Sequence, residues 1–299
     1  MKILNMGSVN IDKVYSVPHF VSAGETLTAG HMDTFPGGKG LNQSVALARA
    51  GVEVWAAGAV GADGQFLAEL LKASGASVEH LQILEDVPTG HAIIQLDPSG
   101  QNSIIISAGA NGALTEAYID SVLSHFGPGD LLLTQNETSN GPYAMKKAKE
   151  RGMKIAFNAS PINGDLPKYP LELVDWFLIN EIEGQTIAGI QETEPEKVLE
   201  ALLQKFPNAA IVLTLGGDGV LYGKGADRFS HGVFKVPVVD TTGAGDTFCG
   251  YFLASLAKGL APQEALHTAS MASALAIGTK GAAVSIPTWA QVQEFGQTH

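Results

Sequence analysis

Cysteine is almost absent from this sequence, because Cys249 is the only one among 299 residues. A single thiol cannot form a disulfide within the chain, which excludes the disulfide-stabilised class of small secreted proteins. Cys249 lies in an apolar stretch, so we interpret it as a packing residue and not as a redox centre. The eight histidines lack the close spacing of zinc ligands, and the sequence predicts no zinc site.

Positive charge is also scarce. The chain has 18 Lys and Arg against 30 Asp and Glu, which gives a formal net charge of −12. Such a surface lacks the clustered cations that bind a nucleic-acid backbone or an anionic membrane, so we expect neither partner. No apolar run approaches the roughly 18 residues of a membrane span, and the first residues lack the apolar core of a signal peptide. These absences predict a cytoplasmic protein.

Apolar sequence is plentiful, with 45% hydrophobic and 16% charged residues, so a large core can form. Short apolar runs alternate with segments in which apolar residues recur at helical spacing, as at Leu41, Val45 and Ala48. This alternation is typical of an α/β fold, a mostly parallel sheet with helices on both faces. We expect one domain over residues 1–299, with strands at 3–6, 52–57, 131–133, 154–157, 176–179 and 211–215.

Two segments interrupt the alternation. Residues 9–35 combine turn residues with weak alternation, and residues 91–107 form a hairpin pattern around the turn cluster 97–102. Because neither segment has helices to cover a sheet, we interpret them as a small antiparallel sheet that projects from the domain as a lid. Ordinary edge hairpins are the alternative. An exposed apolar face on a lid requires a cover, which predicts a homodimer joined through the lids.

Polar side chains follow most of the expected strands. In parallel sheets the carboxyl ends of the strands form the ligand-binding edge. Any one of these side chains could instead cap a helix, which is the interpretation we favour for Asn158. Together they predict a polar ligand site, made of Asn10, Asp12, residues 134–137, Asn158, Asn180, Glu183, Thr214 and Asp240.

A first glycine-rich motif, residues 36–42, leads into an expected helix at residues 41–50. It lacks the spacing of a nucleotide-binding P-loop. Three glycines at a helix start let a ligand approach bare backbone, and Asn42 lies on the first turn. Amide and carboxylate groups suit a ligand rich in hydroxyls, whereas a tight turn with a helix cap is the simpler alternative.

A second motif, residues 240–248, precedes a helix that ends at Lys258 and Gly259. The backbone of Gly243, Ala244 and Gly245 can direct N–H groups at one point and form an anion hole at the helix start. Asp246 follows immediately. It could simply be favourable charge at the positive end of the helix. An anion hole beside a carboxylate is also the arrangement that phosphoryl transfer needs.

Residues 37–46 and 240–248 resemble the two signature motifs of the ribokinase-like carbohydrate kinases. The resemblance continues at residues 7–12, 58–63, 108–114, 180–183 and 214–219, so it covers the whole chain. It implies a three-layer α/β/α domain with a small β-sheet lid. It also implies transfer of the γ-phosphoryl group of ATP to a primary sugar hydroxyl, and the segment 108–114 points to O5 of D-ribose.

The resemblance assigns a role to individual positions. Asp246 matches the catalytic base, and Gly243, Ala244 and Gly245 match the anion hole. Positions matching sugar contacts are Asn10, Asp12, Gly38, Lys39, Asn42 and Glu137. Positions matching nucleotide contacts are Asn180, Thr214, Gly216, Gly219 and Gly245, with Glu183 indirectly at Mg²⁺. Positions matching an activating K⁺ site, several through backbone carbonyls, are Asp240, Thr242, Ala276, Thr279, Gly281 and Ser285.

The sequence departs from the family pattern in places. Residues 158–161 replace a more usual Asn-Pro-Ala-Pro, and Thr279 stands where a basic residue is common. Fructose, a keto-deoxy sugar acid or adenosine are alternative acceptors, although Asp12 would repel an acid and aromatic residues are only 7% of the chain. A non-catalytic binding protein of the same fold is a further alternative. A dinucleotide-binding oxidoreductase is disfavoured, because no G-x-G-x-x-G follows the first strand.

Overall fold

A computed structural model describes residues 1–298 and contains two β-sheets. The larger sheet has the strand order β13-β12-β11-β10-β9-β8-β1-β4-β5. The strands from β5 to β11 in this order run parallel to one another. Strand β12 runs antiparallel to both of its neighbours, β11 and β13. The strands are β1 (Ile3–Met6), β4 (Val54–Gly61), β5 (Ser77–Leu84), β8 (Leu131–Gln135), β9 (Lys154–Asn158), β10 (Trp176–Asn180), β11 (Ala210–Thr214), β12 (Val220–Lys224) and β13 (Asp227–His231).

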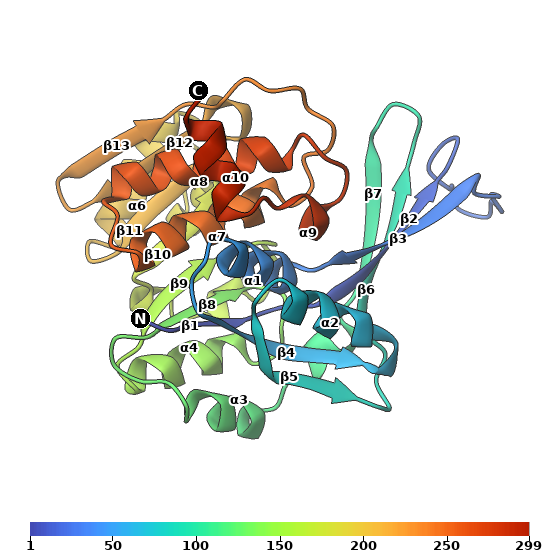
Figure 1. Ribbon diagram of the computed structural model, residues 1–299, viewed down its shortest axis with the longest axis horizontal. Helices are drawn as coiled ribbons and strands as arrows, with labels where there is room; N and C mark the ends of the chain where they lie inside the picture. Colours follow the sequence, from blue (N-terminus) through green and yellow to red (C-terminus); the bar gives the residue numbers. More distant parts are fainter. Residues whose placement is uncertain (299) are drawn as a thin grey trace.

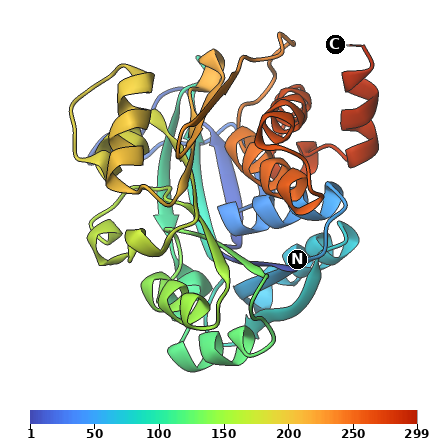
Figure 2. The same ribbon diagram turned by 90° about the vertical axis from the view of Figure 1, so that its left-hand side faces the viewer.

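Helices cover both faces of this sheet, and Figure 2 shows the three layers nearly edge-on. One apolar core lies under α1 (Lys39–Arg49), α2 (Gln65–Ala73), α7 (Ala244–Ala257), α8 (Pro262–Ala276) and α10 (Trp289–Gly296). The other core lies under α3 (Glu116–Leu123), α4 (Gly141–Glu150), α5 (Glu181–Ala188) and α6 (Pro195–Lys205). Short helical turns are α9 (Ala282–Ser285), η1 (Ala62–Gly64), η2 (Gly109–Ala113), η3 (Leu166–Lys168), η4 (Leu171–Leu173) and η5 (Gly216–Asp218).

The smaller sheet projects from the main domain, as Figure 1 shows. Its strand order is β3-β2-β6-β7, built from β2 (Asn10–Ser16), β3 (His31–Gly37), β6 (Gly90–Leu96) and β7 (Asn102–Ser107). The two expected segments therefore form the expected lid. The expected antiparallel pairing is found in both outer pairs, whereas the central pair β2–β6 is parallel. The pairing is parallel because β2 and β6 both leave the main sheet in the same direction.

The comparison of expected and observed strands in the main sheet shows where the apolar pattern failed. The strand expected at residues 52–57 is β4, displaced to Val54–Gly61. The half-exposed strand β5 and the hairpin of β12 and β13 were not expected. The edge strands β5 and β13 mix exposed polar residues with apolar ones, and the apolar run of β12 is short. In the part of the chain described here, no helix is long and apolar enough to cross a membrane.

Strand β1 lies at the point where the chain reverses its direction of travel across the sheet. Its neighbours are β4 on one side and β8 on the other, and both pair with it in parallel. The carboxyl ends of β1 and β8 therefore border a crevice of the kind that binds ligands in open α/β sheets. The lid strands begin beyond the end of β1, and α7 begins on the same side.

Candidate functional site

The Asp246 side chain is held between two helices. It lies in the first turn of α7, behind the N-cap residue Gly243, and is only 8% exposed. Its Oδ2 accepts a hydrogen bond from Asn42 Nδ2 at 2.9 Å, and its Oδ1 accepts one from Gln43 Nε2 at 2.8 Å. Both donors belong to α1 and not to its own helix. The carboxylate is therefore positioned by tertiary contacts, which a simple helix-capping role does not require.

The first glycine motif brings α1 against the end of β1. Gly38 has φ 90°, and a Cβ there would lie 2.7 Å from the carbonyl oxygen of Ser8. A Cβ on Gly40 would lie 2.4 Å from the backbone of Gly7. Any larger residue would separate the two segments, so the glycines are needed for close approach. This approach places Lys39 and Asn42 at the carboxyl end of the central strand.

A second close approach sets the position of α7 on α1. A Cβ on Gly250 would lie 2.4 Å from the Cβ of Ala46. The two helices consequently pack with almost no side chain between them, one turn beyond Asp246 and Asn42. This contact fixes the distance that the two hydrogen bonds to Asp246 span.

Three carboxylates gather around the Lys39 ammonium. Burial lowers the pKa of Lys39, but the charges of Asp246, Glu137 and Glu183 outweigh it and hold that pKa above its usual value. Burial raises the pKa of Glu137, although Lys39 partly opposes the rise. Burial, with repulsion from Glu137 and Asp246, raises the pKa of Asp12 to about 6. The site therefore concentrates negative charge around a single cation.

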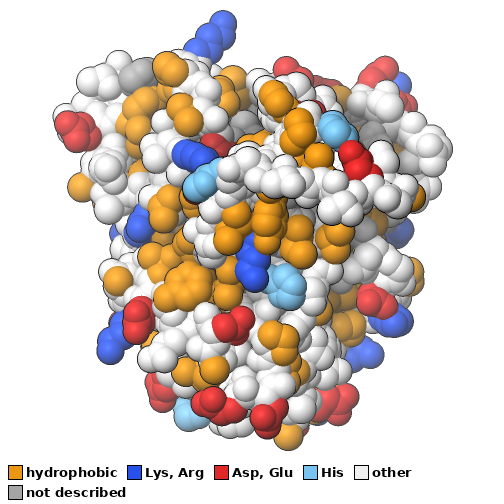
Figure 3. Space-filling view, turned by 90° about the vertical axis from the view of Figure 1, so that its right-hand side faces the viewer, with side chains coloured by type: hydrophobic (Ala, Val, Ile, Leu, Met, Phe, Trp, Pro, Cys, Tyr) orange, Lys and Arg blue, Asp and Glu red, His pale blue; other side chains and the backbone are white. Residues whose placement is uncertain are grey.

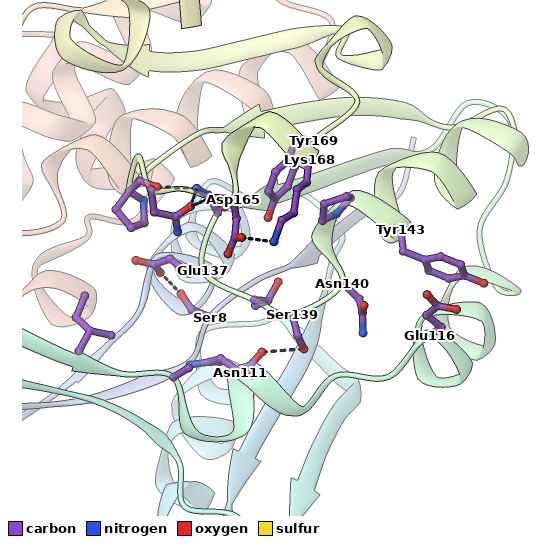
Figure 4. A pocket seen from close by; sticks show the side chains of 18 of the residues that line it. Ser8, Asn111, Glu116, Glu137, Ser139, Asn140, Tyr143, Asp165, Lys168 and Tyr169 are labelled. Carbon is purple, nitrogen blue, oxygen red and sulfur yellow. Dashed lines mark hydrogen bonds and ion pairs between the residues drawn. The ribbon is translucent and has the colours of Figure 1, made fainter. Parts of the chain in front are cut away.

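Two cavities meet at this cluster. The larger cavity, about 830 Å³, is lined by Asn10 and Glu137. It extends to Asn140, at the start of α4, and to Lys168, in the η3 turn that follows β9. Figure 4 shows Ser8 and Glu137 turned toward each other at its inner end, where the Ser8 hydroxyl donates to Glu137 Oε2. The smaller, about 150 Å³, is lined by Lys39, Asn158, Asn180, Glu183, Thr214, Gly243, Gly245, Asp246 and Cys249, among others. Glu137 lines the larger cavity and Asp246 the smaller, and the Lys39 backbone N–H, from the lining of the smaller, donates to Glu137 Oε2 at 3.4 Å.

The polar residues around the smaller cavity also form local structure. Asn180 and Glu183 make a capping box at the start of α5, with Asn180 Oδ1 accepting from Glu183 N at 2.9 Å and Glu183 Oε2 accepting from Asn180 N at 3.0 Å. Thr214 Oγ1 donates to the Ile179 carbonyl at 3.3 Å. The capping interpretation is thus correct for Asn180, while the same residues line the cavity.

The anion hole at α7 is only partly free. The first N–H groups of a helix have no acceptor within it, and Gly243 and Gly245 both line the smaller cavity. The Ala244 N–H instead donates to the Thr241 carbonyl at 3.2 Å. The structure thus places the donors of Gly243 and Gly245 at the cavity and directs that of Ala244 into a turn.

Asp240 connects two loops behind α7. Its Oδ1 accepts from the backbone N–H and the hydroxyl of Thr242, and its Oδ2 accepts from Gly281 N at 2.8 Å. Burial alone would raise the pKa of Asp240, but these hydrogen bonds hold it below its usual value. The Ala276 carbonyl accepts from Thr279 N at 3.2 Å, and the Ser285 hydroxyl donates to the Ala282 carbonyl. The expected cation-loop residues thus form two hydrogen-bonded loops joined by one carboxylate.

The structure brings most expected site residues together. Asp12, Gly38 and Asn42 line neither cavity; Asn42 contacts Asp246 directly, Asp12 interacts with it through charge, and Gly38 packs against Ser8. Gly216 and Gly219 form the turn after Thr214; a Cβ on Gly219 would lie 2.2 Å from the His231 carbonyl oxygen. Residues 234–239, which lie between β13 and the second glycine motif, do not form a strand.

Sequence reasoning missed a set of buried amides. Gln43 is fully buried and contacts Asp246, Gln135 and Asn158. Asn158 ends β9 without capping a helix, since its Oδ1 accepts from Gln43 Nε2 and its Nδ2 donates to the Leu178 carbonyl. The capping interpretation of Asn158 was therefore wrong. The available signal was the position of Gln43 beside Asn42, within the segment 37–46 that resembles a signature motif of the family.

Comparisons with known proteins agree with this geometry. Residues 1–289 match the pfkB family of carbohydrate kinases. The chain is 35% identical over 297 residues to the ribokinase of Haemophilus influenzae, covering 97% of this chain and 96% of that protein. It is 33% identical to the ribokinase of Bacillus subtilis, with 97% of each covered.

Solved structures give the same result. The structure of Arabidopsis thaliana ribokinase complexed with ribose and ATP has a TM-score of 0.89 at 28% identity, covering 98% of this chain and 97% of that one. The ribokinase of Cryptococcus neoformans in complex with ADP has a TM-score of 0.87 at 34% identity, covering 98% of this chain and 99% of that one.

Proposed function

The chain belongs to the pfkB family of carbohydrate kinases, and from that premise we propose that it transfers the γ-phosphoryl group of ATP to O5 of D-ribose. The observation that carries the proposal is the position of Asp246, which Asn42 and Gln43 fix on the wall of the smaller cavity at the start of α7. The names of the relatives reported above, which are ribokinases, support ribose as the acceptor, and one of their structures is complexed with ribose and ATP.

The chemistry follows from the charges. The ribose hydroxyl is a weak nucleophile, and the Asp246 carboxylate takes its proton as it attacks phosphorus. The N–H groups of Gly243 and Gly245 at the start of α7, with Lys39 opposite, stabilise the charge that develops on the phosphoryl oxygens. The proton ends on the carboxylate and the leaving group is ADP.

The acceptor side suits a small polyol. Asn42 Oδ1 is buried and has no hydrogen-bond partner within residues 1–298, although Asn42 Nδ2 is used. Leaving a buried acceptor unpaired is unfavourable, and a sugar hydroxyl that reaches Asp246 would satisfy it. Asn10 and Glu137, which line the larger cavity, and the nearby Asp12 supply further acceptors for vicinal hydroxyls.

Two metal ions belong to the proposal. Glu183 is the carboxylate that fits Mg²⁺ indirectly, because Mg²⁺ in phosphoryl transfer is held mainly by the nucleotide and water. The oxygen-rich loops joined by Asp240 fit a monovalent cation such as K⁺, with Thr242, Ala276, Thr279, Gly281 and Ser285 offering oxygen atoms. When bound there, the cation adds positive charge behind the α7 N-terminus.

The assembly and location are proposed on separate grounds. One face of the lid sheet exposes Met32, Ile93 and Ile105, which we call the apolar lid surface, whereas Ile104 and Ile106 lie on the opposite face with Asp12. Figure 3 shows hydrophobic side chains gathered on this side of the molecule. We expect a second copy of the chain to cover them, which makes a homodimer. Dependence on ATP and a lone unpaired cysteine fit the cytoplasm.

Replacement of Asp246 tests the proposed function. Asp246→Asn keeps the shape of the side chain but removes the base, so kcat should fall by about 10²–10⁴-fold. The melting temperature and the KM for ribose should be largely retained. The measurement is ADP release over a panel of ribose, deoxyribose, fructose and adenosine. Asp227→Asn, an exposed carboxylate at the start of β13, is the matched control.

The alternative role of Asp246 gives the opposite result. A purely structural carboxylate at a helix start predicts a stability loss of roughly 0.5–2 kcal/mol with nearly normal turnover. A folded Asp246→Asn protein that keeps more than about a tenth of the wild-type kcat therefore excludes general-base catalysis by Asp246. A preference for fructose or adenosine over ribose would exclude ribose as the acceptor and leave the kinase assignment intact.

A further inference from the structure

Gln43 lies directly behind the proposed base but cannot touch either substrate. Its side chain is fully buried in α1 and lines neither of the two cavities. Its Nε2 donates to Asp246 Oδ1 at 2.8 Å and to Asn158 Oδ1 at 3.1 Å. Any effect of this residue on the reaction therefore has to pass through its neighbours.

Gln43 belongs to a chain of buried amides that crosses the sheet edge. Gln135 Nε2 donates to Gln43 Oε1 at 2.7 Å and to Asn5 Oδ1 at 2.9 Å. Asn5 Nδ2 donates in turn to the Gly40 carbonyl and to the Ser44 hydroxyl oxygen, both at 2.8 Å. The chain thus begins on β1, passes through β8 and α1, and ends at the carboxylate on α7.

The direction of the chain is fixed. An amide NH₂ has two hydrogens, and both are used at Asn5, Gln135 and Gln43. Reversing Gln43 would point its carbonyl oxygen at Asp246 Oδ1, which is also an acceptor, and leave Gln135 Nε2 facing a donor. Because an ionised carboxylate can only accept, this arrangement alone directs a donor at Asp246, and Gln135 Oε1 is left without a partner within residues 1–298.

We propose that Gln43 is a positioning residue that fixes the rotamer of Asp246 through this amide chain. With Oδ1 occupied by Gln43 and Oδ2 by Asn42, the plane of the carboxylate is set before ribose binds. A displacement of about 1 Å between reacting groups can lower a rate about 10²-fold. The inference rests on the proposed function, in which Asp246 is the base.

The test compares Gln43→Met in two backgrounds. Methionine keeps the length and burial of the side chain but removes both donors, so kcat should fall by about 10–10²-fold with the KM values for ribose and ATP unchanged. In the Asp246→Asn background the same change should cause no additional loss, because residues that act as a unit are not additive. Ser255→Ala is the control, since the Ser255 hydroxyl on α7 is buried with no partner within residues 1–298 and lies outside the amide chain.

Each outcome bears on the proposal. An unchanged kcat in folded Gln43→Met, or an equal loss in both backgrounds, overturns it. If Gln43→Met does not fold, Gln135→Met replaces it: the proposal requires a smaller loss of kcat, again absent beside Asp246→Asn, and no loss overturns it. A fully active Asp246→Asn protein would refute the proposed function instead. That failure is distinguishable from failure of the positioning role, because it is seen with Asp246→Asn alone and does not involve the Gln43 variant.

Discussion

At the scale of single residues, the site balances the carboxylates of Glu137, Glu183 and Asp246 against the ammonium of Lys39, and Glu137 and Asp246 both repel the carboxylate of Asp12. Sugar recognition needs buried acceptors, and buried acceptors that carry charge oppose folding. Asp12 bears this conflict most clearly, because burial is the main cause that raises its pKa to about 6. Its protonated form is favoured in the folded protein, and its ionised form becomes a destabilising charge near neutral pH.

Asp12→Asn should therefore stabilise the protein as it weakens sugar binding. The pKa of Asp12 is raised from 3.8 to about 6, so the native state binds more protons than the unfolded state between these values. The penalty is absent below about pH 3.8, grows as pH rises, and is complete above about pH 6. We expect Asp12→Asn to gain about 1–3 kcal/mol at pH 8 and less at pH 4.5, and to raise the KM for ribose about tenfold.

Thermal denaturation at the two pH values and initial-rate kinetics measure both effects. Asp33→Asn on the neighbouring lid strand is the control, because the hydrogen bond from His31 lowers the pKa of Asp33 and removing that charge should bring no gain at pH 8. A pH-independent change in melting temperature at Asp12, or an equal rise in the KM for ATP, would contradict this account.

Residues of the site differed in how far the sequence could place them. Asp246 and Asn42 lie in motifs whose spacing suggested their roles, and the structure joins them directly. Asn158 was misjudged, because an amide at a strand end looks the same in the sequence whether it caps a helix or donates to a neighbouring strand. Gln43 was missed, because its place in α1 does not reveal which side chains it contacts. Which partner an amide finds depends on residues more than a hundred positions away, as between Gln43 and Asn158.

At the scale of elements, the start of α7 is held by loops that bear no catalytic group. Asp240 joins residues 240–242 to Gly281. Gly243, at φ 76°, would bring a Cβ to 2.8 Å from the Cβ of Ala282. The geometry of the Gly243 and Gly245 donors is therefore set by how these loops pack. Sequence motifs indicated the loops, but their mutual contact is tertiary and could not be read from local spacing.

Turnover should therefore depend on the monovalent cation. A cation held between these loops adds positive charge near the developing phosphoryl charge, so the rate in K⁺ should exceed the rate in Na⁺ or choline, by about tenfold if it contributes about 1.4 kcal/mol. Rates are compared at constant ionic strength, with Asp240→Asn expected to remove the difference. Equal rates in all three salts for the unchanged protein would argue against a cation site here.

At the scale of the whole molecule, the alternating apolar runs predicted the layered sheet because buried parallel strands are apolar along their whole length. The edge strands β5 and β13 were not predicted, since their partly exposed residues mix with polar ones, and neither was β12, whose apolar run between β11 and β13 is short. The lid was recognised by its lack of helices, although the order of its strands depended on long-range pairing. That sheet now presents the apolar lid surface, with Ile105 62% exposed on the edge strand β7.

We expect the protein to be a dimer at micromolar concentration, as measured by sedimentation equilibrium. Ile105→Asp places a charge in the apolar lid surface and should produce monomers. The melting temperature of the variant monomer should stay close to that of the dissociated wild-type chain, because position 105 is exposed. Ile83→Asp, at a 47% exposed position on β5, should leave the dimer intact. A wild-type monomer under these conditions would show that the apolar lid surface has another purpose.

The route of the chain through the lid gives it a mechanical character. Strand β2 carries Asn10 and Asp12 outward from the end of β1, and β3 returns directly into Gly38 and Lys39 at the start of α1. The base of the lid therefore lies in the catalytic centre. A displacement of the outer end of the lid would move the sugar contacts on β2 and the start of α1 together, so that closure over the sugar and completion of the acceptor side would occur in one movement. Water that enters while the lid is displaced would meet a site in which the sugar contacts and the start of α1 are away from their catalytic positions.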